Sequence, residues 1–301
     1  MKTIAIVQAR QNSKRFPNKV LKKLNSQTII DILNDKLKKS KKINDIVFAI
    51  PLKSSEKKLK NYLISKQIDF YEGSEKNVLE RFYKAAKKYS ADKIVRITAD
   101  CPLLDIQLID QVIDFSNNNP VYDYVSNTLN PTYPDGLDVE IFSLKALELA
   151  QKNSRTQFEK EHVTQFLIRN DRIKKYSYEN NENYSQLRWT LDTPEDYKVL
   201  KKIFKNFKNK KNQGWKSVLN FCLKNSHIMT NINYLRNYKS ISLKEKYWEK
   251  AKKYIPGQNS MISKHPDLYL KNLWPTYFKK AKGCSVWSLE NKRYYDLSIM
   301  S

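Results

Sequence analysis

Short apolar segments alternate with amphipathic segments over the first two thirds of this 301-residue chain. This alternation constrains the fold most strongly, because strands separated by helices form βαβ units, and such units build a parallel sheet with helices on both faces. The predicted strands are residues 4–7, 46–50, 68–71, 93–98 and 122–126, and the predicted helices are residues 28–40, 54–66, 77–89 and 107–117. The sequence therefore predicts an α/β fold with a mostly parallel sheet.

The alternation of strands and helices weakens after residue 130. Pro134 and Gly136 precede an alternating run within residues 133–142, which predicts a loop that leads into an arm or hairpin over the sheet. The period of two places Asp138 and Glu140 on one face of this run. The predicted elements that follow are a helix at residues 157–170, strands at 172–178 and 186–191, and a helix from Pro194.

A change in composition marks a boundary near residues 205–214. This segment is charged and rich in Asn, and four of the five tryptophans of the chain come after it. Such a shift is typical of a domain boundary. We therefore predict a main domain at residues 1–210, a helical linker at 211–245 and a small C-terminal module at 246–301.

The formal net charge of +25 can indicate a polyanionic partner. The lysines are spread over the whole chain, however, and this pattern fits a compositional bias equally well. Arg, which proteins prefer for reading phosphate and guanine, is scarce. The composition therefore argues against a nucleic-acid partner.

The apolar runs are too short for a transmembrane helix, and the first ten residues resemble a strand rather than a signal peptide. Cys101, Cys222 and Cys284 lie far apart and form no CxxC pair. Unpaired cysteines favour a reducing compartment. We therefore expect a cytoplasmic protein without a membrane partner.

A basic loop follows the first predicted strand. Arg10, Ser13, Arg15 and Lys19 occur in quick succession after the strand ends at Gln8. Such a loop at the carboxyl end of a buried strand is where open α/β sheets bind phosphorylated ligands. Three cations and a hydroxyl could hold a polyphosphate, although the loop has neither a Walker nor a GxGxxG pattern. The alternative is a basic surface loop without a ligand.

Two carboxylates follow later predicted strands. Asp100 comes after the strand at residues 93–98, and Asp192 comes after the strand at 186–191. Carboxylates at the same sheet edge as a cationic loop could bind Mg²⁺ beside a nucleoside triphosphate. The alternative is that Asp100 and Asp192 cap turns or helices.

Residues 9–21 carry the pattern A-R-x-x-S-x-R-x-P-x-K-x-L, which resembles the signature of the CMP-sugar synthetases. Within that superfamily, the chain is most similar to the spore coat polysaccharide biosynthesis protein F family. The resemblance covers about residues 1–205. The supporting segments are residues 73–89, 94–105, 122–128, 133–142, 158–166 and 187–197.

The resemblance implies a three-layer, Rossmann-like nucleotidyltransferase fold. It also implies Mg²⁺-dependent transfer of a nucleotide, with CTP the expected donor, to an acidic sugar or similar acceptor in surface polysaccharide synthesis, with release of pyrophosphate. Family members are often homodimers through an arm like residues 133–142. In this family Gly is usual where the chain has Asn12 and Asn18. Asn tolerates a left-handed backbone better than most residues, so the loop could keep its shape.

The resemblance also implies roles for individual residues. Arg15, Lys19 and Asp100 would be catalytic, and Asp100 and Asp192 would hold the metal. The nucleotide would contact Ala9, Arg10, Ser13, Arg15, Lys19, Ser74, Arg81 and Arg96. The acceptor would contact Asp135, Asp138, Glu140, Glu161 and His162.

Two other functions fit the same residues. A sugar-binding or glycosyl-transferring relative could share the sheet, although the DxD pair that would favour it is absent after residues 93–98. A basic protein that binds nucleic acid or a partner enzyme is the other alternative.

Residues 246–301 resemble the N-terminal arm of glutamate-1-semialdehyde aminotransferase and other class III aminotransferases. The alternation in residues 284–298 predicts a small hairpin with Glu290 and Asn291 at its turn. This resemblance implies either the front part of a bifunctional enzyme or a module that docks onto an aminotransferase partner.

Overall fold

A computed structural model describes most of the chain as two units, Met1–Tyr238 and Lys239–Ser301. The described residues are 1–13, 15–207, 214–225, 251, 254, 255, 277–289 and 293–295. Much of the predicted linker and of the predicted C-terminal module lies outside them. Each unit is therefore described by itself.

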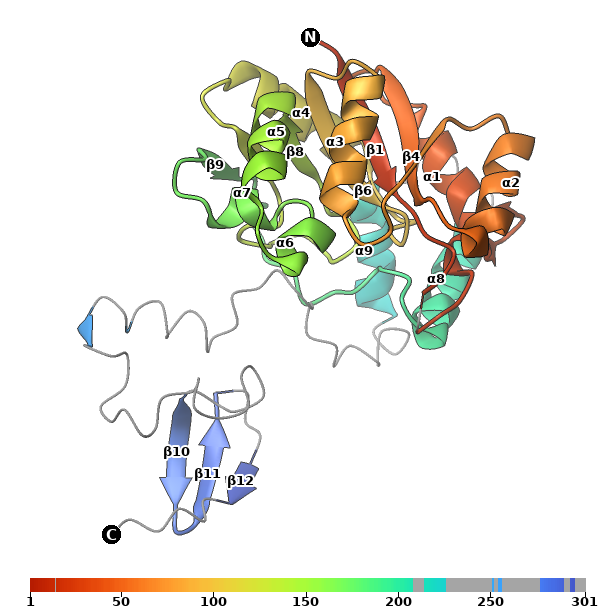
Figure 1. The fold of residues 1–301 in the computed structure, drawn as a ribbon. Helices are drawn as coiled ribbons and strands as arrows, with labels where there is room; N and C mark the ends of the chain where they lie inside the picture. The colour runs from red at the N-terminus through yellow and green to blue at the C-terminus, as the bar shows by residue number, and fades with distance from the viewer. Residues whose placement is uncertain are drawn as a thin grey trace. The chain divides into compact units, whose positions relative to one another are not determined.

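The first unit is built on a seven-stranded sheet with the order β5-β4-β1-β6-β8-β7-β9 (Figure 1). Its strands are β1 (Thr3–Gln8), β4 (Asp45–Pro51), β5 (Phe70–Gly73), β6 (Lys93–Thr98), β7 (Tyr124–Ser126), β8 (Glu140–Ser143) and β9 (Lys175–Ser177). Only β8 runs antiparallel to its neighbours, β6 and β7, so the prediction of a mostly parallel sheet is confirmed. A separate pair, β2 (Lys23–Leu24) and β3 (Gln27–Thr28), forms a short hairpin.

Helices connect these strands, and polar caps fix where many of them begin. The helices are α1 (Ile29–Leu37), α2 (Lys57–Ser65), α3 (Val78–Lys88), α4 (Ile106–Asn118), α5 (Leu144–Asn153), α6 (Gln157–Glu161), α7 (Gln165–Arg169), α8 (Pro194–Asn206) and α9 (Trp215–Lys224). Two 3₁₀ helices, η1 (Lys19–Leu21) and η2 (Ser54–Glu56), precede α1 and α2. Thr28 and Thr193 form capping boxes at α1 and α8, which satisfies amide groups that have no partner within the helix.

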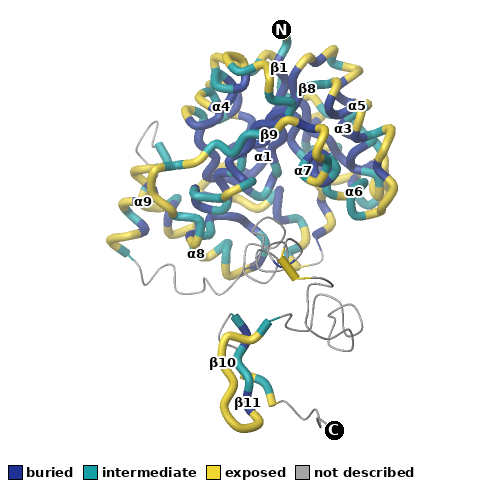
Figure 2. The backbone as a smooth tube through the Cα atoms, turned by 90° about the vertical axis from the view of Figure 1, so that its left-hand side faces the viewer, coloured by how far each residue is buried: buried dark blue, intermediate teal, exposed yellow. Residues whose placement is uncertain are grey.

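The sheet separates two hydrophobic layers, because successive side chains of a strand point to opposite faces. In β1, Ala5 and Val7 pack with α1, α2, α4, α8 and α9, whereas Ile4 and Ile6 pack with α3, α5 and α7. Figure 2 shows the buried residues gathered along the strands and the inward sides of the helices. The predicted three-layer α/β fold is therefore confirmed.

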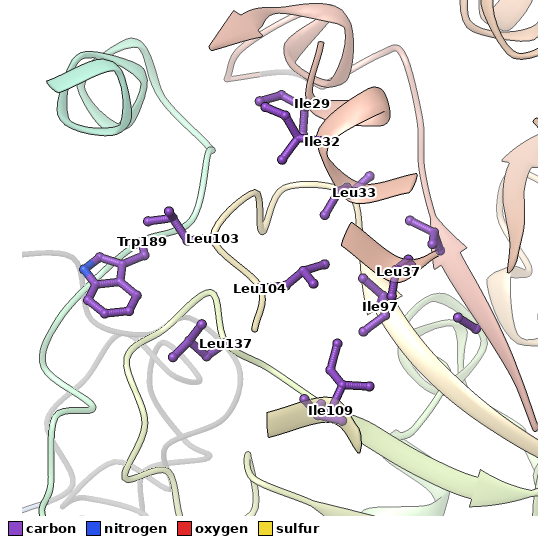
Figure 3. Close-up of a cluster of buried hydrophobic side chains, with 14 of the residues drawn as sticks. Ile29, Ile32, Leu33, Leu37, Ile97, Leu103, Leu104, Ile109, Leu137 and Trp189 are labelled. Carbon is purple, nitrogen blue, oxygen red and sulfur yellow. The ribbon is translucent and has the colours of Figure 1, made fainter. Parts of the chain in front are cut away.

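One part of this core lies close to the carboxyl ends of the strands. Leu33 and Leu37 of α1 face Leu104 and Ile97, with Trp189 and Leu137 further along the same cluster (Figure 3). All of these side chains are at most 3% exposed. Burying each contributes about 1.5–3 kcal/mol, so this packing fixes the segments on which the polar residues described below are carried.

Three local predictions are wrong. Residues 133–142 do not form an arm, because their last three residues belong to the inner strand β8. Residues 186–191 form no strand, because Gln186 lies in a turn and Arg188 makes an isolated bridge to Asp135. The helix predicted at 157–170 is two helices, α6 and α7, and Val163 between them has a φ of 40°.

The second unit contains a three-stranded antiparallel sheet of β10 (Phe278–Lys282), β11 (Ser285–Ser288) and β12 (Arg293–Tyr295). Trp287 pairs with Arg293, so β11 and β12 form the predicted hairpin. Its predicted turn at Glu290 and Asn291 lies outside the described residues. Lys280 and Arg293 both place their charge near the Trp287 ring, at 5.1 and 5.8 Å from its centroid.

In the described parts of the chain, every helix is too short or too polar to cross a membrane.

Candidate functional site

The two loops that carry the predicted site leave the sheet side by side. Gln8 at the end of β1 is in register with Thr98 at the end of β6. Because β8 runs the other way, its first residue, Glu140, enters the sheet at this same edge, next to Arg96. Helices α6, α8 and α9 lie at the end of this unit that is opposite the N-terminus (Figure 1).

Lys19 joins the two predicted metal ligands. Its Nζ donates to Asp100 Oδ2 at 2.8 Å and to Asp192 Oδ1 at 2.7 Å. The Lys19 side chain is 8% exposed, and burial alone would lower its pKa, but the two carboxylates outweigh burial and raise the pKa above its ordinary value. Lys19 therefore stays positively charged at physiological pH and lies between the two carboxylate groups.

The pKa of Asp100 is shifted in the opposite direction. Burial alone would raise it, but the charge of Lys19 and its hydrogen bond hold this pKa well below the ordinary range. Asp100 is therefore ionised at neutral pH. An ionised carboxylate is a stronger ligand for a hard cation than a protonated one.

Arginines hold the other side of Asp192. Arg15 lies 3.1 Å and Arg188 lies 3.0 Å from Asp192 Oδ2. Arg188 also contacts Asp196 at 3.2 Å and Asp135 at 3.3 Å. One guanidinium group thus fixes three carboxylates, which are only 12–19% exposed.

Neither of the two predicted metal ligands is the N-cap of the helix that follows it. Thr193 is the N-cap of α8 and accepts from the Asp196 amide, while Asp196 accepts from the Thr193 amide. Asp105, not Asp100, is the N-cap of α4. The carboxylates of Asp100 and Asp192 are therefore directed at Lys19.

Glu56 anchors the start of the basic loop. Its Oε2 accepts from the Gln11 amide at 2.5 Å, and the Gln11 side chain in turn accepts from the Leu59 amide. The Glu56 side chain is buried, so this anchor is protected from water. The loop closes where the Asn18 amide donates to the Gln11 carbonyl at 2.9 Å.

Asn18 has the left-handed backbone that its family position suggested, with φ 56° and ψ 21°. Asn12 is not among the residues with a positive φ in the described chain. Of these two described positions, residue 18 is therefore the one that needs the conformational freedom of Gly or Asn.

Asn18→Ala is expected to lower the free energy of unfolding by about 1 kcal/mol, because a Cβ without a compensating polar group disfavours this conformation by about that amount. Asn18→Gly should keep wild-type stability within about 0.5 kcal/mol, because Gly adopts positive φ without strain. Urea unfolding of both variants measures the difference. Equal losses for Ala and Gly would show that the Asn18 side chain, not its backbone, matters.

The other predicted nucleotide residues have different surroundings. Ala9 and Ser13 are buried and Arg10 is exposed. Arg81 is buried, donates to the Ser74 carbonyl at 2.5 Å, and lies so close to Gly73 that a Cβ there would meet it at 2.9 Å. Burial lowers the pKa of Arg81 to about 10, with a contribution from the nearby charge of Arg10.

Arg96 belongs to a buried network rather than to an open surface. It forms an ion pair with Glu140 and donates to Gln8 Oε1 at 3.0 Å. Glu140 Oε1 also accepts from the Tyr124 hydroxyl at 2.6 Å and from the Thr164 hydroxyl at 2.9 Å. Since Arg96 can only donate, the Gln8 amide must present its oxygen to Arg96, which fixes its orientation.

The five predicted acceptor residues do not gather in one place through the contacts described. Asp135 binds Arg188, and Glu140 lies in the buried network with Arg96. Glu161 is exposed at the end of α6, and His162 packs on Phe158 with ring centroids 4.6 Å apart. Asp138 is half-buried.

Sequence reasoning missed Arg188 and Glu56. Arg188 had a signal, because it is a lone charge in an apolar run four residues before Asp192. Glu56 had none, because it resembles any acid of a charged helical segment.

The donor set around Lys19 suits a hard cation. Asp100 and Asp192 converge on one ammonium group, so the protein already places a positive charge between them. Within the described residues no group of three or more His, Cys, Asp or Glu could hold a metal. Two carboxylates plus substrate phosphates and water are the usual ligand set of Mg²⁺, whereas sites built wholly from protein groups are typical of other metals.

The doubly wound sheet, the cationic loop after β1 and the paired carboxylates at the same edge are what is expected of a nucleotidyltransferase. A family model for cytidylyltransferases matches residues 4–218. The chain therefore belongs to the cytidylyltransferase family and is a CTP-dependent nucleotidyltransferase.

Several individual proteins are similar to this chain. An uncharacterised protein of Methanocaldococcus jannaschii is 41% identical over 236 residues, which are 77% of this chain and 95% of the relative. The solved structure of a cytidylyltransferase from Leptospira borgpetersenii is 30% identical, with a TM-score of 0.73, and the match covers 78% of this chain and 99% of that one. The spore coat polysaccharide biosynthesis protein SpsF of Bacillus subtilis is 29% identical over 208 residues, 66% of this chain and 85% of the relative.

The family model ends before the second unit. The resemblance of residues 246–301 to class III aminotransferases is not supported by any of these matches and stays a prediction.

Proposed function

We propose that this protein transfers a cytidylyl group from CTP to an acidic, hydroxyl-rich sugar with the help of Mg²⁺ and releases pyrophosphate. The convergence of Asp100 and Asp192 on Lys19, beside the loop anchored by Glu56, is the observation that carries the proposal. The similarity to a protein named for spore coat polysaccharide biosynthesis supports a place in surface polysaccharide synthesis.

The cations of the loop would bind the triphosphate of CTP. Lys19 and Arg15 neutralise carboxylates in the structure, and both could turn to phosphate oxygens when the nucleotide enters. The Arg15 side chain is 50% exposed, so it has room for this change. Arg188 would stay with Asp192, Asp196 and Asp135, and so keep Asp192 in position.

Asp100 and Asp192 would hold Mg²⁺ once Lys19 has turned to the phosphates. The metal would supply positive charge to the phosphate oxygens. Arg188 and the packing of Trp189 restrict the backbone around Asp192, so the chain presents this carboxylate in a fixed position. Such preorganisation is what electrostatic stabilisation of a transition state requires.

The transfer itself would need no covalent intermediate on the protein. The acceptor hydroxyl oxygen would form a bond to the α-phosphorus and release its proton to water, while the bond from that phosphorus to the bridging oxygen, which leaves with pyrophosphate, breaks. Negative charge then collects on the leaving pyrophosphate, where Arg15 and Lys19 would neutralise it. Burial raises the pKa of the neighbouring Cys101 thiol well above its ordinary value, which argues against its use as a nucleophile.

Pyrophosphate release from CTP, UTP, GTP and ATP with Mg²⁺, against a panel of acidic sugars, tests the proposal. Release is expected with CTP and one acceptor class. Asp100→Asn is expected to reduce that rate by about 10²-fold without unfolding the protein, because a neutral amide binds a cation far more weakly.

The matched control is Asp171→Asn, which makes the same change at an exposed turn and should keep the wild-type rate. Absence of CTP binding by calorimetry would contradict the proposal directly. An unchanged rate in Asp100→Asn would remove this residue from the mechanism.

A second proposal concerns the C-terminal module. Its resemblance to an aminotransferase arm, together with the exposure of Phe278 and Tyr295, supports docking onto an aminotransferase. Co-purification of the full chain with and without residues 246–301 tests docking, and no difference in captured aminotransferase would contradict it. A homodimer, also expected from the resemblance, is tested by the mass of the full chain in solution.

A further inference from the structure

A cavity of about 250 Å³ lies between the start of α4 and the start of α9. Its walls include Gln107 and Gln111 of α4, Tyr133, Asn180 and Trp215. None of these residues belongs to the predicted nucleotide, metal or acceptor sets. The cavity is smaller than the 300–1,000 Å³ typical of drug-sized ligands, so a single small ring is a suitable occupant.

Two aromatic residues line the cavity and pack against each other. The Tyr133 and Trp215 rings meet edge to face, with centroids 5.4 Å apart, and Tyr184 contacts Trp215 at 6.3 Å. Burial, with contributions from Tyr178 and Asp105, raises the pKa of Tyr133 to about 12. The Tyr133 phenol therefore stays protonated at physiological pH and keeps its hydroxyl hydrogen.

Side-chain amides also line the cavity. Gln107 and Gln111 are four residues apart on α4, so their side chains share one face of the helix, and both are exposed. Each amide offers two N–H donors and an acceptor oxygen, as does Asn180. Neighbouring hydroxyl groups of a sugar ring need this mixture of donors and acceptors.

The acid in the wall of the cavity is already neutralised. Asp105 Oδ1 accepts from the Leu108 amide at 2.8 Å and Oδ2 accepts from the Trp215 amide at 2.7 Å. The carboxylate therefore binds the positive ends of two helices. Lys216, which carries an ammonium group, also lines the cavity, so a hydroxyl-rich ring that carries an acidic group matches what remains of the cavity better than a free cation does.

The cavity lies near the reaction centre along the chain. Tyr133 is two residues from Asp135, so their Cα atoms are at most about 7 Å apart. Asp135 binds Arg188, which binds Asp192. Asp105 follows Asp100 by five residues. Tyr133 and Asp105, which both line the cavity, are therefore only a few residues away from the site residues Asp135 and Asp100.

We infer that this cavity binds the hydroxyl-rich ring of the acceptor, with Trp215 and Tyr133 against its C–H groups and Gln107, Gln111 and Asn180 on its hydroxyls. This inference rests on the proposed function and adds the surface on which the acceptor is selected. It also explains how an acceptor can be bound although Glu140 and Asp135 already have protein partners.

Saturation-transfer NMR of the full chain tests the inference. The probes are 3-deoxy-manno-octulosonate, N-acetylneuraminate, mannose and cyclohexanecarboxylate, which lacks hydroxyls. At least one hydroxylated ring is expected to bind, and Gln107→Met with Gln111→Met should weaken its binding by about tenfold, because two hydrogen bonds are lost at similar side-chain volume. Adding Trp215→Phe to the double variant should weaken the binding of the hydroxylated ring further.

Gln151→Met on α5, which packs on the other face of the sheet, is the matched control and should bind as wild type does. No binding by any hydroxylated ring, or equal binding by the double variant, would overturn the inference. CTP affinity, measured separately by calorimetry, should be unchanged in the double variant. Sugar binding without CTP binding would contradict the proposed function but would support this cavity as a sugar site. CTP binding, together with unchanged sugar binding in the double variant, would support the proposed function but contradict the assignment of this cavity.

Discussion

Lys19→Ala is expected to lower kcat by about 10²–10³-fold, because one positive charge that stabilises the developing charge on pyrophosphate is lost. The variant also leaves Asp100 and Asp192 facing each other without the ammonium group between them. Two carboxylates that share a site repel each other, so one of them should take up a proton more readily. Pyrophosphate release under saturating CTP measures the loss of turnover.

Lys53→Ala is the matched control, because Lys53 pairs with Glu75 at 2.8 Å but its side chain is 48% exposed. An exposed ion pair contributes at most about 1 kcal/mol, so this control should keep both its rate and its stability. A Lys19→Ala enzyme with a wild-type rate would show that the ammonium group only pairs with carboxylates and never reaches the triphosphate.

The pH dependence of stability gives a second measurement of the same contact. Lys19 holds the pKa of Asp100 below its unfolded value, so this contact stabilises the fold above about pH 4 and is lost as the pH falls toward the lower folded pKa. In Lys19→Ala the two influences of Lys19 that lower the pKa of Asp100 are lost, while burial, which raises this pKa, and the hydrogen bonds from Thr98 and the backbone, which lower it, remain. The difference in unfolding free energy between wild type and Lys19→Ala should therefore be larger near pH 7 than near pH 3, as urea unfolding at both values can show.

The sequence predicted well those features that depend on chain order alone. The strands β1 and β6 are short apolar runs, and parallel pairing then puts the loops after them at one edge. Lys19 and Asp100 meet for this reason although 81 residues separate them. Asp192 joins them although its segment is not a strand, because Leu191 is held to the Asp100 backbone by a hydrogen bond of 2.7 Å.

Features that depend on long-range pairing could not be predicted in this way. The charges of Asp138 and Glu140 suggested an exposed arm, yet Glu140 is 1% exposed within the sheet. Its burial is possible only because Arg96, which is 44 residues away, lies beside it across the β6–β8 pairing. No local pattern shows that an acid on an alternating strand has a distant arginine as its partner.

The role of Arg188 was hidden for a related reason. Its residue type gave a signal, but its meaning depends on Asp135 and Asp196, which come from a different loop and from a helix start. The caps of α4 and α8 are an opposite case, because Asp105 and Thr193 occupy local motifs that sequence can resolve. Once these residues are recognised as the caps, Asp100 and Asp192 are left for the site.

Glu140→Ala is expected to lower the free energy of unfolding by about 3–5 kcal/mol, because it leaves the buried charge of Arg96 without its partner. For a unit of this size, such a loss corresponds to a fall in melting temperature of roughly 10 °C. The variant also removes the acceptor for the Tyr124 and Thr164 hydroxyls, both of which are buried. Thermal and urea unfolding of the purified chain measure the effect.

Glu140→Gln separates charge from hydrogen bonding. The Gln oxygen can still accept from Tyr124 or Thr164, so this variant should lose less stability than Glu140→Ala. Glu75→Ala is the exposed control and should change stability by less than about 1 kcal/mol. If Glu140→Ala melted like wild type but raised the KM for the acceptor, Glu140 would be an acceptor residue as the family resemblance implies. A large loss of stability in Glu140→Ala, together with an unchanged KM for the acceptor in Glu140→Gln, would instead assign Glu140 to the buried network that orients Gln8 at the end of β1.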